Sequence, residues 1–96
     1  MILTFEWDED KSRQNAGKHG VTFNEAKTVF NDPFAITIAD PDHSDQEDRY
    51  IDIGLSSKGR VLVLWYTERE ENIRLIGCRK AMPSERRSYE KRGQGL

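Results

Sequence analysis

The sequence predicts one α+β domain, in which a short strand and two helices precede a four-stranded antiparallel meander and one helix closes the chain. Four segments between residues 34 and 79 are rich in β-branched and aromatic side chains, and short polar links separate them, as in consecutive antiparallel strands. The segments on either side carry signals for helix starts and stops. A chain of 96 residues suits a single domain, 1–96, with one modest core.

The N-terminal segment predicts a strand and then a capped helix. Apolar residues alternate with polar or smaller ones up to Trp7, which is the period of a strand. Asp8 is a typical N-cap residue, and Gly20 suits the left-handed position that ends a helix. The helix expected between them has almost no apolar stripe.

A second helix is expected from Thr22 to a stop at Pro33. Thr22 and Glu25 have the spacing of a capping box, and proline disfavours helix in the residue before it. The later elements are expected as strands near 34–38, 51–55, 61–66 and 73–79, a polar loop at 40–45, a charged turn at 68–72 and a helix over 83–93. The residues expected to share one core are Phe23, Phe30, Ile53, Val63 and Leu75.

Charge is distributed unevenly along the chain. The net charge is only −2, which argues against a generally basic nucleic-acid binder. Residues 1–52 hold 5 Lys or Arg and 12 Asp or Glu, whereas residues 53–96 hold 10 and 5. The second half can therefore carry a local cationic site, although a solvated face with ion pairs would have the same composition.

The lone cysteine, Cys78, excludes an internal disulfide and fits a reducing cytosol. We expect a cytoplasmic protein, because the apolar start is too short for a signal peptide and no apolar run approaches the roughly 20 residues of a membrane helix. His19 and His43 form no zinc motif, so neither a metal nor another cofactor is expected. Cys78 itself is expected to be a small buried residue rather than a nucleophile.

Cations in the last predicted strand are the first candidates for function. Arg74, Arg79 and Lys80 lie among apolar residues, where a long cation must reach water or an anion. Strict alternation puts Arg74 and Lys80 on one face of the sheet and Arg79 on the other. A bulge at Gly77 would bring the two arginines together, since glycine within a strand is a plausible bulge site.

The first predicted helix supplies a second set of candidates. Lys11, Asn15 and either Lys18 or His19 recur at helical spacing and share one polar face. Such a face can bind phosphate, whereas Lys18 and His19 can equally serve only to complement the helix dipole.

Cleavage of RNA without a metal requires residues of these kinds. The 2′-hydroxyl lies next to the scissile phosphate, so the protein must supply a proton acceptor, a proton donor and cations for the developing charge. Single-stranded RNA also favours an aromatic platform, for which Tyr66 is a candidate.

Short motifs spread over nearly the whole chain, from about Phe5 to Tyr89, carry a family resemblance. In chain order they include Phe5-Glu6-Trp7-Asp8, Lys18-His19-Gly20-Val21, Asp40-Pro41-Asp42-His43-Ser44, Tyr66-Thr67-Glu68-Arg69, Ile73-Arg74-Leu75-Ile76 and Arg79-Lys80-Ala81. In this order and spacing they resemble the BrnT-type toxins of bacterial toxin–antitoxin pairs. The resemblance implies a RelE-like fold and a ribonuclease that stops translation. It also implies a cognate BrnA-like antitoxin with a ribbon-helix-helix region, through which the pair would bind operator DNA.

The expected site combines these cations with groups for proton transfer. Arg69, Arg74 and Arg79 are expected around the scissile phosphate, with Lys18 or His19 approaching from the first helix. Proton transfer would fall to His19, Glu68 or Tyr66, because arginine is a poor proton shuttle. Further RNA contacts are expected from Lys11, Lys18, Lys80 and Arg86.

Two alternatives remain open at this stage. Arg74 and Arg79 can instead pair with Glu68, Glu70 or Glu85 and tie the sheet to its turn and closing helix. A non-catalytic antitoxin-binding module, or a co-repressor of its own operon, would also carry the same sequence features.

Overall fold

The computed structural model describes residues 3–40, 42 and 48–94. Most of the polar loop predicted at 40–45 therefore lies outside the described residues. The elements follow the predicted order, and none of the helices in the described part of the chain is long and apolar enough to cross a membrane. They are β1 (Thr4–Glu6), α1 (Glu9–His19), α2 (Phe23–Ala26), the 3-10 helix η1 (Lys27–Asn31), β2 (Ile36–Ala39), β3 (Arg49–Leu55), β4 (Val61–Arg69), β5 (Asn72–Lys80) and α3 (Pro83–Gln94).

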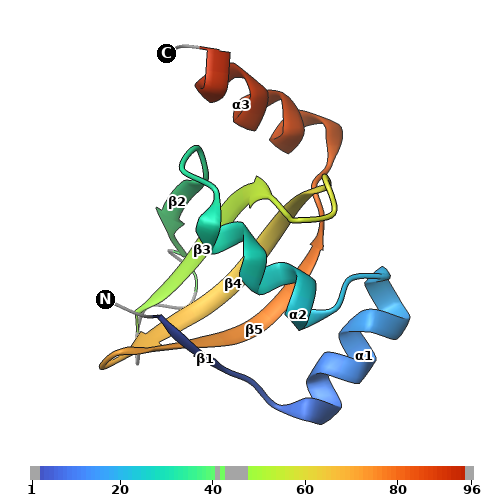
Figure 1. Ribbon diagram of the computed structural model, residues 1–96, viewed down its shortest axis with the longest axis vertical. Coiled ribbons are helices and arrows are strands. Elements are labelled where there is room, and N and C mark those ends of the chain that lie inside the picture. Colours follow the sequence, from blue (N-terminus) through green and yellow to red (C-terminus); the bar gives the residue numbers. More distant parts are fainter. Residues whose placement is uncertain (1–2, 41, 43–47, 95–96) are drawn as a thin grey trace.

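The strands form one five-stranded mixed sheet in the order β1-β5-β4-β3-β2 (Figure 1). Strands β2 to β5 pair with their chain neighbours in antiparallel fashion, whereas β1 pairs with β5 in parallel. The sequence indicated the first strand but not its place at this edge. The turn between β4 and β5 is also shorter than the predicted turn at 68–72, because both strands extend into it.

The predicted helix caps are confirmed. The Asp8 carboxylate accepts hydrogen bonds from the backbone N–H groups of Asp10 and Lys11, at 2.8 and 3.1 Å. Gly20 ends α1 in the left-handed conformation, with φ of 69°. Thr22 accepts from the backbone N–H of Glu25 at 3.0 Å, but the helix that it starts tightens into η1 after one turn.

The main core lies between the sheet and the α2–η1 segment, which crosses one sheet face in Figure 1. Phe23 and Leu75 belong to it as predicted, and the half-buried Phe30 packs against it. The prediction is wrong for Ile53 and Val63, which are register partners on the opposite face of the sheet. The buried members of the core are Val21, Phe23, Ala26, Val29, Leu62, Leu64, Tyr66, Ile73, Leu75 and Cys78.

A glycine in β3 lets the helical segment approach the sheet closely. A Cβ atom added at Gly54 would stand 2.7 Å from Cγ1 of Val29 and 3.0 Å from Cβ of Ala35. The first contact is closer than Cβ atoms approach in proteins and the second is tight, so any side chain here would push η1 away from β3.

A buried ion pair joins α2 to the turn between β3 and β4. Glu25 is 4% exposed, and its carboxylate accepts hydrogen bonds from Ser56 Oγ at 2.7 Å and Arg60 Nε at 2.9 Å. A second guanidinium nitrogen of Arg60 also donates to Glu25, and it reaches the carbonyl oxygen of Gly20 at 3.2 Å. The hydrogen bonds from Arg60 hold the pKa of Glu25 below its usual value.

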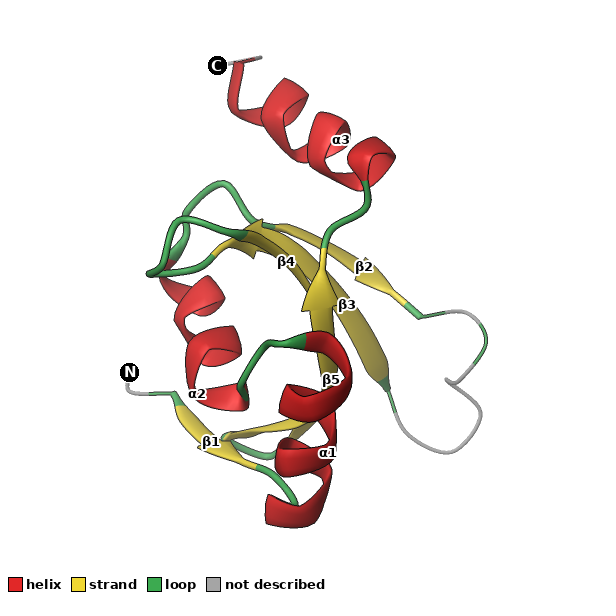
Figure 2. Ribbon diagram, turned by 90° about the vertical axis from the view of Figure 1, so that its right-hand side faces the viewer, coloured by secondary structure: helices red, strands yellow, loops and turns green. Residues whose placement is uncertain are grey.

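The closing helix α3 projects beyond the end of the sheet (Figure 2). Two side-chain contacts between described residues join it to the body. Glu85 pairs with Arg79 of β5, and the Tyr89 hydroxyl donates to Asp32 at 2.5 Å. Asp32 also accepts from the backbone N–H of Leu55 at 2.8 Å, so one carboxylate connects α3, β3 and the end of η1.

Replacing Arg60 by alanine should lower the free energy of unfolding at pH 7, because it leaves a buried carboxylate with fewer donors. The loss should shrink in acid, as the pH falls below the ordinary pKa of a glutamate side chain. The pKa of Glu25 is lowered by folding, so its contribution is present above its unfolded pKa and disappears as the carboxylate is protonated. Urea unfolding at pH 7 and pH 3 measures both values. Lys58→Ala, an exposed cation of the same turn, is the control and should change little.

Candidate functional site

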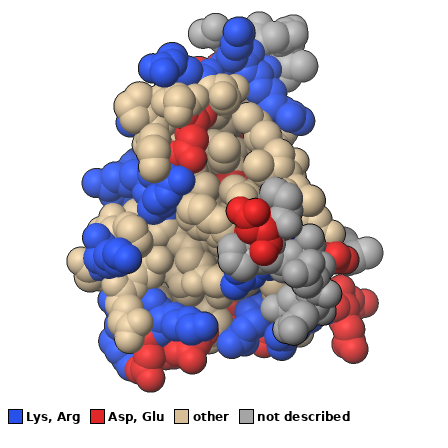
Figure 3. Space-filling view, turned by 180° about the vertical axis from the view of Figure 1, so that it is seen from behind, with Lys and Arg blue, Asp and Glu red and all other residues tan. Residues whose placement is uncertain are grey.

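The sheet face opposite the main core is termed the outer face. Alternation along the paired strands assigns to it Ile36, Ile38, Arg49, Ile51, Ile53, Leu55, Val61, Val63, Trp65, Thr67, Arg69, Arg74 and Arg79. Figure 3 views the molecule from this side. It shows an area with few charged side chains, with Lys and Arg along one side and at the top, and with both basic and acidic side chains along the lower edge.

One extra residue in β5 decides which side chains reach the outer face. Trp65 lies opposite Gly77 and Tyr66 lies opposite Leu75, so Ile76 has no partner in the register. This bulge keeps both Leu75 and Cys78 on the core side, and it places Arg74 and Arg79 on the outer face. The bulge predicted at Gly77 therefore lies one residue earlier, at Ile76, and Lys80 falls on the other face, opposite Leu62.

Arg74 occupies the end of the outer face near the β4–β5 turn. Its guanidinium lies 3.7 Å from the Glu6 carboxylate, beyond ordinary hydrogen-bond distance, and its side chain is 34% exposed. Arg74 and Lys11 both lie close enough to Asp8 to lower its pKa, although the backbone N–H donors act more strongly. Arg69 is a diagonal neighbour of Arg74 across the strand pair, so the structure brings these two predicted residues together.

Arg79 makes different contacts at the other end of β5. Its two terminal nitrogens donate to the two carboxylate oxygens of Glu85 at 2.7 and 2.9 Å, and the pKa of Glu85 is lowered as a result. The guanidinium also lies 5.2 Å from the centre of the Trp65 ring. Four residues of strand separate the Arg79 and Arg74 positions, or about 13 Å. The alternative in which Arg79 ties the sheet to the closing helix therefore fits its contacts.

Two predicted proton-transfer residues lie on the core side of the sheet. Tyr66 is 3% exposed, and its hydroxyl donates to Asp52 at 2.9 Å. Burial and the nearby Asp52 carboxylate raise its pKa well above the usual value. Glu68 shares the face of Tyr66, opposite Ile73, and is exposed at the strand end. Because a strand alternates its side chains, neither residue shares a face with Arg74.

The predicted polar face of α1 lines a groove along β5. The groove has a volume of about 320 Å³ and is lined by Lys11, Gln14, Asn15, Lys18, His19 and Ile76. Asn15 has a structural role, because it donates to the carbonyl oxygen of Val21 at 2.9 Å and accepts from the backbone N–H of Cys78 at 3.2 Å. Lys11 lies at the Arg74 end, and Lys18 is about 10 Å further along the helix.

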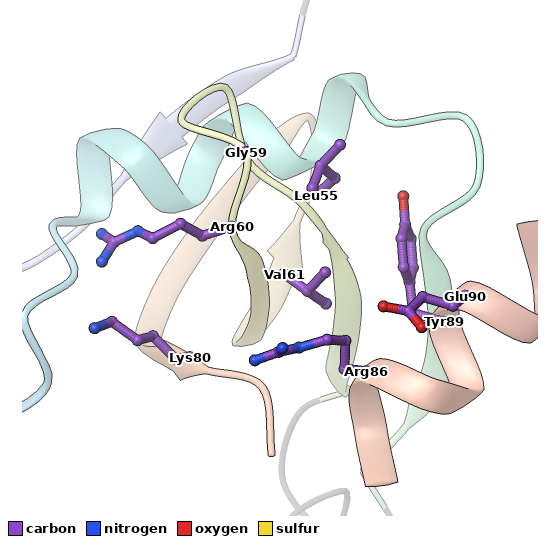
Figure 4. Close-up of a pocket in the computed structure, with 8 residues that line it drawn as sticks. All are labelled: Leu55, Gly59, Arg60, Val61, Lys80, Arg86, Tyr89 and Glu90. Atoms are coloured by element: carbon purple, nitrogen blue, oxygen red, sulfur yellow. The ribbon is translucent and has the colours of Figure 1, made fainter. Parts of the chain in front are cut away.

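The remaining predicted RNA contacts lie at the α3 end of the molecule. Lys80 and Arg86 line a cavity of about 490 Å³ between α3 and the turn that carries Arg60. Figure 4 shows Arg86 reaching from α3 into the space beside the strand of Lys80. These two cations are therefore separate from the groove along α1.

Trp65 is the aromatic residue of the outer face, and sequence reasoning missed it in favour of Tyr66. It is half-buried beside Arg79, and β5 offers only a glycine opposite it. Alternation along β4 could have identified it. Leu62, Leu64 and Tyr66 lie on the core face, so Trp65 lies on the outer face.

The described part of the chain offers neither a metal site nor a reactive thiol. No group of three His, Cys, Asp or Glu side chains is placed to hold a metal ion among those residues. Cys78 is buried as predicted, and burial raises the pKa of its thiol to about 11. A thiol in this state is a poor nucleophile at neutral pH.

Comparisons with known proteins point in one direction. The model of a family described as "Ribonuclease toxin, BrnT, of type II toxin-antitoxin system" matches residues 7–85. The crystal structure of the Brucella abortus ribonuclease toxin BrnT is similar in fold, with a TM-score of 0.61 and 20% sequence identity. The match covers 85% of this chain and 99% of that one. No curated protein sequence matches.

The Arg79–Glu85 contact should contribute measurably to stability. Arg79→Ala and Glu85→Gln should each lower the melting temperature, and the double variant should lose less than the sum, with a coupling energy of about 1 kcal/mol. Thermal unfolding followed by circular dichroism measures the cycle. Arg87→Ala, an exposed arginine on the same helix, is the matched control. Additive losses would mean that the pair does not tie α3 to the sheet.

Proposed function

The chain belongs to the BrnT family of ribonuclease toxins of type II toxin–antitoxin systems, and we propose that it is a metal-independent endoribonuclease that inhibits translation in the cytoplasm. The observation that supports this most directly is the position of Arg74. It lies half-exposed on the outer face, with Arg69 and Lys11 nearby and Trp65 one rung along the sheet. This arrangement offers cations for a phosphate and an aromatic ring for a base.

The proposed reaction uses the substrate's own nucleophile. The 2′-oxygen of RNA forms a bond to the adjacent phosphorus while the bond from phosphorus to the 5′-oxygen breaks. The 2′-hydroxyl proton passes to a base, and an acid gives a proton to the leaving 5′-oxygen. The products are a cyclic 2′,3′-phosphate and a free 5′-hydroxyl. The protein need only position these groups and stabilise the charge that develops on the phosphate oxygens.

The described residues suggest a division of labour. Arg74 would bind the scissile phosphate, because the planar guanidinium fork can donate two hydrogen bonds and keeps its charge. Arg69 and Lys11 would hold neighbouring phosphates along the strand. His19 lines the groove roughly 12 Å along α1 from Lys11, so it would contact a neighbouring nucleotide rather than the scissile phosphate.

A type II toxin has a protein antitoxin as its partner, and we assign that role to a BrnA-like chain with a ribbon-helix-helix region. Two features of this chain suit a protein partner. The outer face carries apolar side chains in a row across three strands, including the exposed Ile38 and Leu55. Met82, at the start of the projecting helix α3, is 55% exposed. Covering these surfaces would bury large apolar areas.

Purified protein should cleave single-stranded RNA, and EDTA should leave the rate unchanged. Arg74→Ala should reduce the rate by about 10²–10³-fold, as loss of a donor to a developing oxyanion does elsewhere. The variant should keep its circular dichroism spectrum, since a partly exposed cation adds little stability. Arg13→Ala removes the same charge from an exposed position on α1 and serves as the control.

The same assay separates the enzyme from the non-catalytic alternative. A folded parent protein that binds its antitoxin and operator but cleaves no RNA would establish the co-repressor reading. Cleavage retained by Arg74→Ala would instead remove Arg74 from the site.

Co-expression with the antitoxin from the same operon should yield a stable complex that buries more than roughly 1,000 Å² in total. Met82→Glu should weaken that complex, because it puts a charge on an exposed apolar side chain beside the projecting helix. Size-exclusion chromatography and calorimetry of the two purified chains measure this. Recovery of this chain alone, at concentrations in the micromolar range, would contradict the proposal.

A further inference from the structure

Three neighbouring strands place a threonine between two arginines, with one arginine on each side of it. Thr67 of β4 lies opposite Arg74 of β5 and opposite Arg49 of β3. Glu6 of β1 lies next to Arg74 on the far side. Directly opposed residues of antiparallel strands point to the same face, with their Cα atoms about 4.5–5.5 Å apart. The two arginine positions are therefore about 10 Å apart, with Thr67 midway between them.

The hydroxyl of Thr67 is buried without a hydrogen bond. Thr67 is 0% exposed, and its Oγ1 is the buried side-chain nitrogen or oxygen atom without a hydrogen-bond partner in the described part of the chain. Such a group costs free energy, and valine would fill the same space without that cost. An anion that accepted a hydrogen bond from this hydroxyl would remove that cost.

The guanidinium groups of the two arginines beside Thr67 have N–H donors that are not used in hydrogen bonds with described residues. Arg74 is joined to Glu6 only by a long ion pair of 3.7 Å. The guanidinium of Arg49 makes no hydrogen bond or ion pair with any described residue. Arginine forks bind tetrahedral phosphate through paired hydrogen bonds, and their long stems can turn toward an anion above Thr67.

We propose that Arg49, Thr67 and Arg74 form a phosphate-binding site on the outer face, in which the arginine side chains turn to admit the phosphate and the threonine hydroxyl donates a hydrogen bond to an oxygen held by both guanidinium groups. The assignment of that phosphate to the RNA backbone rests on the proposed function. The next rung supports it, because Ile51 and Trp65 lie there beside Arg49 and Thr67, where an unstacked base can lie against the indole. Arg49 lies in the acidic half of the chain, outside the basic cluster that sequence reasoning favoured.

Titration of inorganic phosphate into the ¹⁵N-labelled full-length protein tests the site independently of cleavage. The Nε–H signals of Arg49 and Arg74 and the amide of Thr67 should shift together and saturate. Arg49→Ala and Arg74→Ala should each weaken binding by about tenfold or more, and Arg49→Lys should be intermediate because it keeps the charge but loses the fork. Arg13→Ala, an exposed cation on α1 with the same charge change, should bind phosphate as the parent does.

Two further variants separate a built site from general attraction to positive charge. Thr67→Val should weaken phosphate binding severalfold while its melting temperature stays equal or rises, because it removes an unpaired buried hydroxyl. Glu6→Gln should tighten phosphate binding, because the carboxylate competes for Arg74. Unchanged phosphate binding in Thr67→Val would remove the hydroxyl from the site and overturn the proposal.

Cleavage assays on the same variants distinguish this inference from the proposed function. RNA cleavage that falls in Arg49→Ala together with phosphate affinity, in a protein with the parent's melting temperature, supports both. Phosphate binding that depends on Arg49 in a protein that cleaves no RNA would refute the enzyme and keep the site. Cleavage and phosphate binding both undiminished in Arg49→Ala would overturn the site and leave the enzyme standing.

Discussion

The single extra residue in β5 is the constraint on which the arrangement of the molecule depends. Without a bulge at Ile76, the alternation set by Leu75 would carry Cys78 out of the core and turn Arg79 into it. The bulge lets one strand bury Leu75 and Cys78 under α2 while both of its arginines reach the other face. An interior strand of the sheet thereby completes the core and supplies cations to the surface.

Each of these two arginines pairs with an acidic residue, and the pair is close at one end of the strand and long at the other. Glu85 accepts two short hydrogen bonds from Arg79, and this ion pair helps to attach α3 to the sheet. Glu6 stays 3.7 Å from Arg74 and leaves most of its donors unused. The phosphate that we propose would compete with a weak partner at Arg74 and with a strong one at Arg79. An acidic net charge is therefore compatible with the proposed anion site, because a few local charges dominate the field at short range.

Close packing on the core side of the sheet fixes the positions of the strands that form the outer face. Gly54 lets η1 approach β3, and the Glu25–Arg60 pair joins α2 to the adjoining turn. Asn15 fixes α1 against β5 through hydrogen bonds at both ends of its amide. These contacts all lie away from the outer face, so the side chains proposed to meet RNA or an antitoxin can be varied with little loss of core packing.

The sequence by itself determined the features that depend on neighbouring residues. Asp8, Gly20 and Thr22 act within one turn of helix, and Cys78 lies in an apolar strand, so each could be predicted from its surroundings in the chain. Only the tertiary structure decided which residues of separate strands meet. The parallel pairing of β1, the inward turn of Tyr66 and the meeting of Arg49, Thr67 and Arg74 all follow from registers between segments far apart in sequence. A shift of one residue in any of those registers would send each side chain to the opposite face, and local pattern alone does not fix that choice.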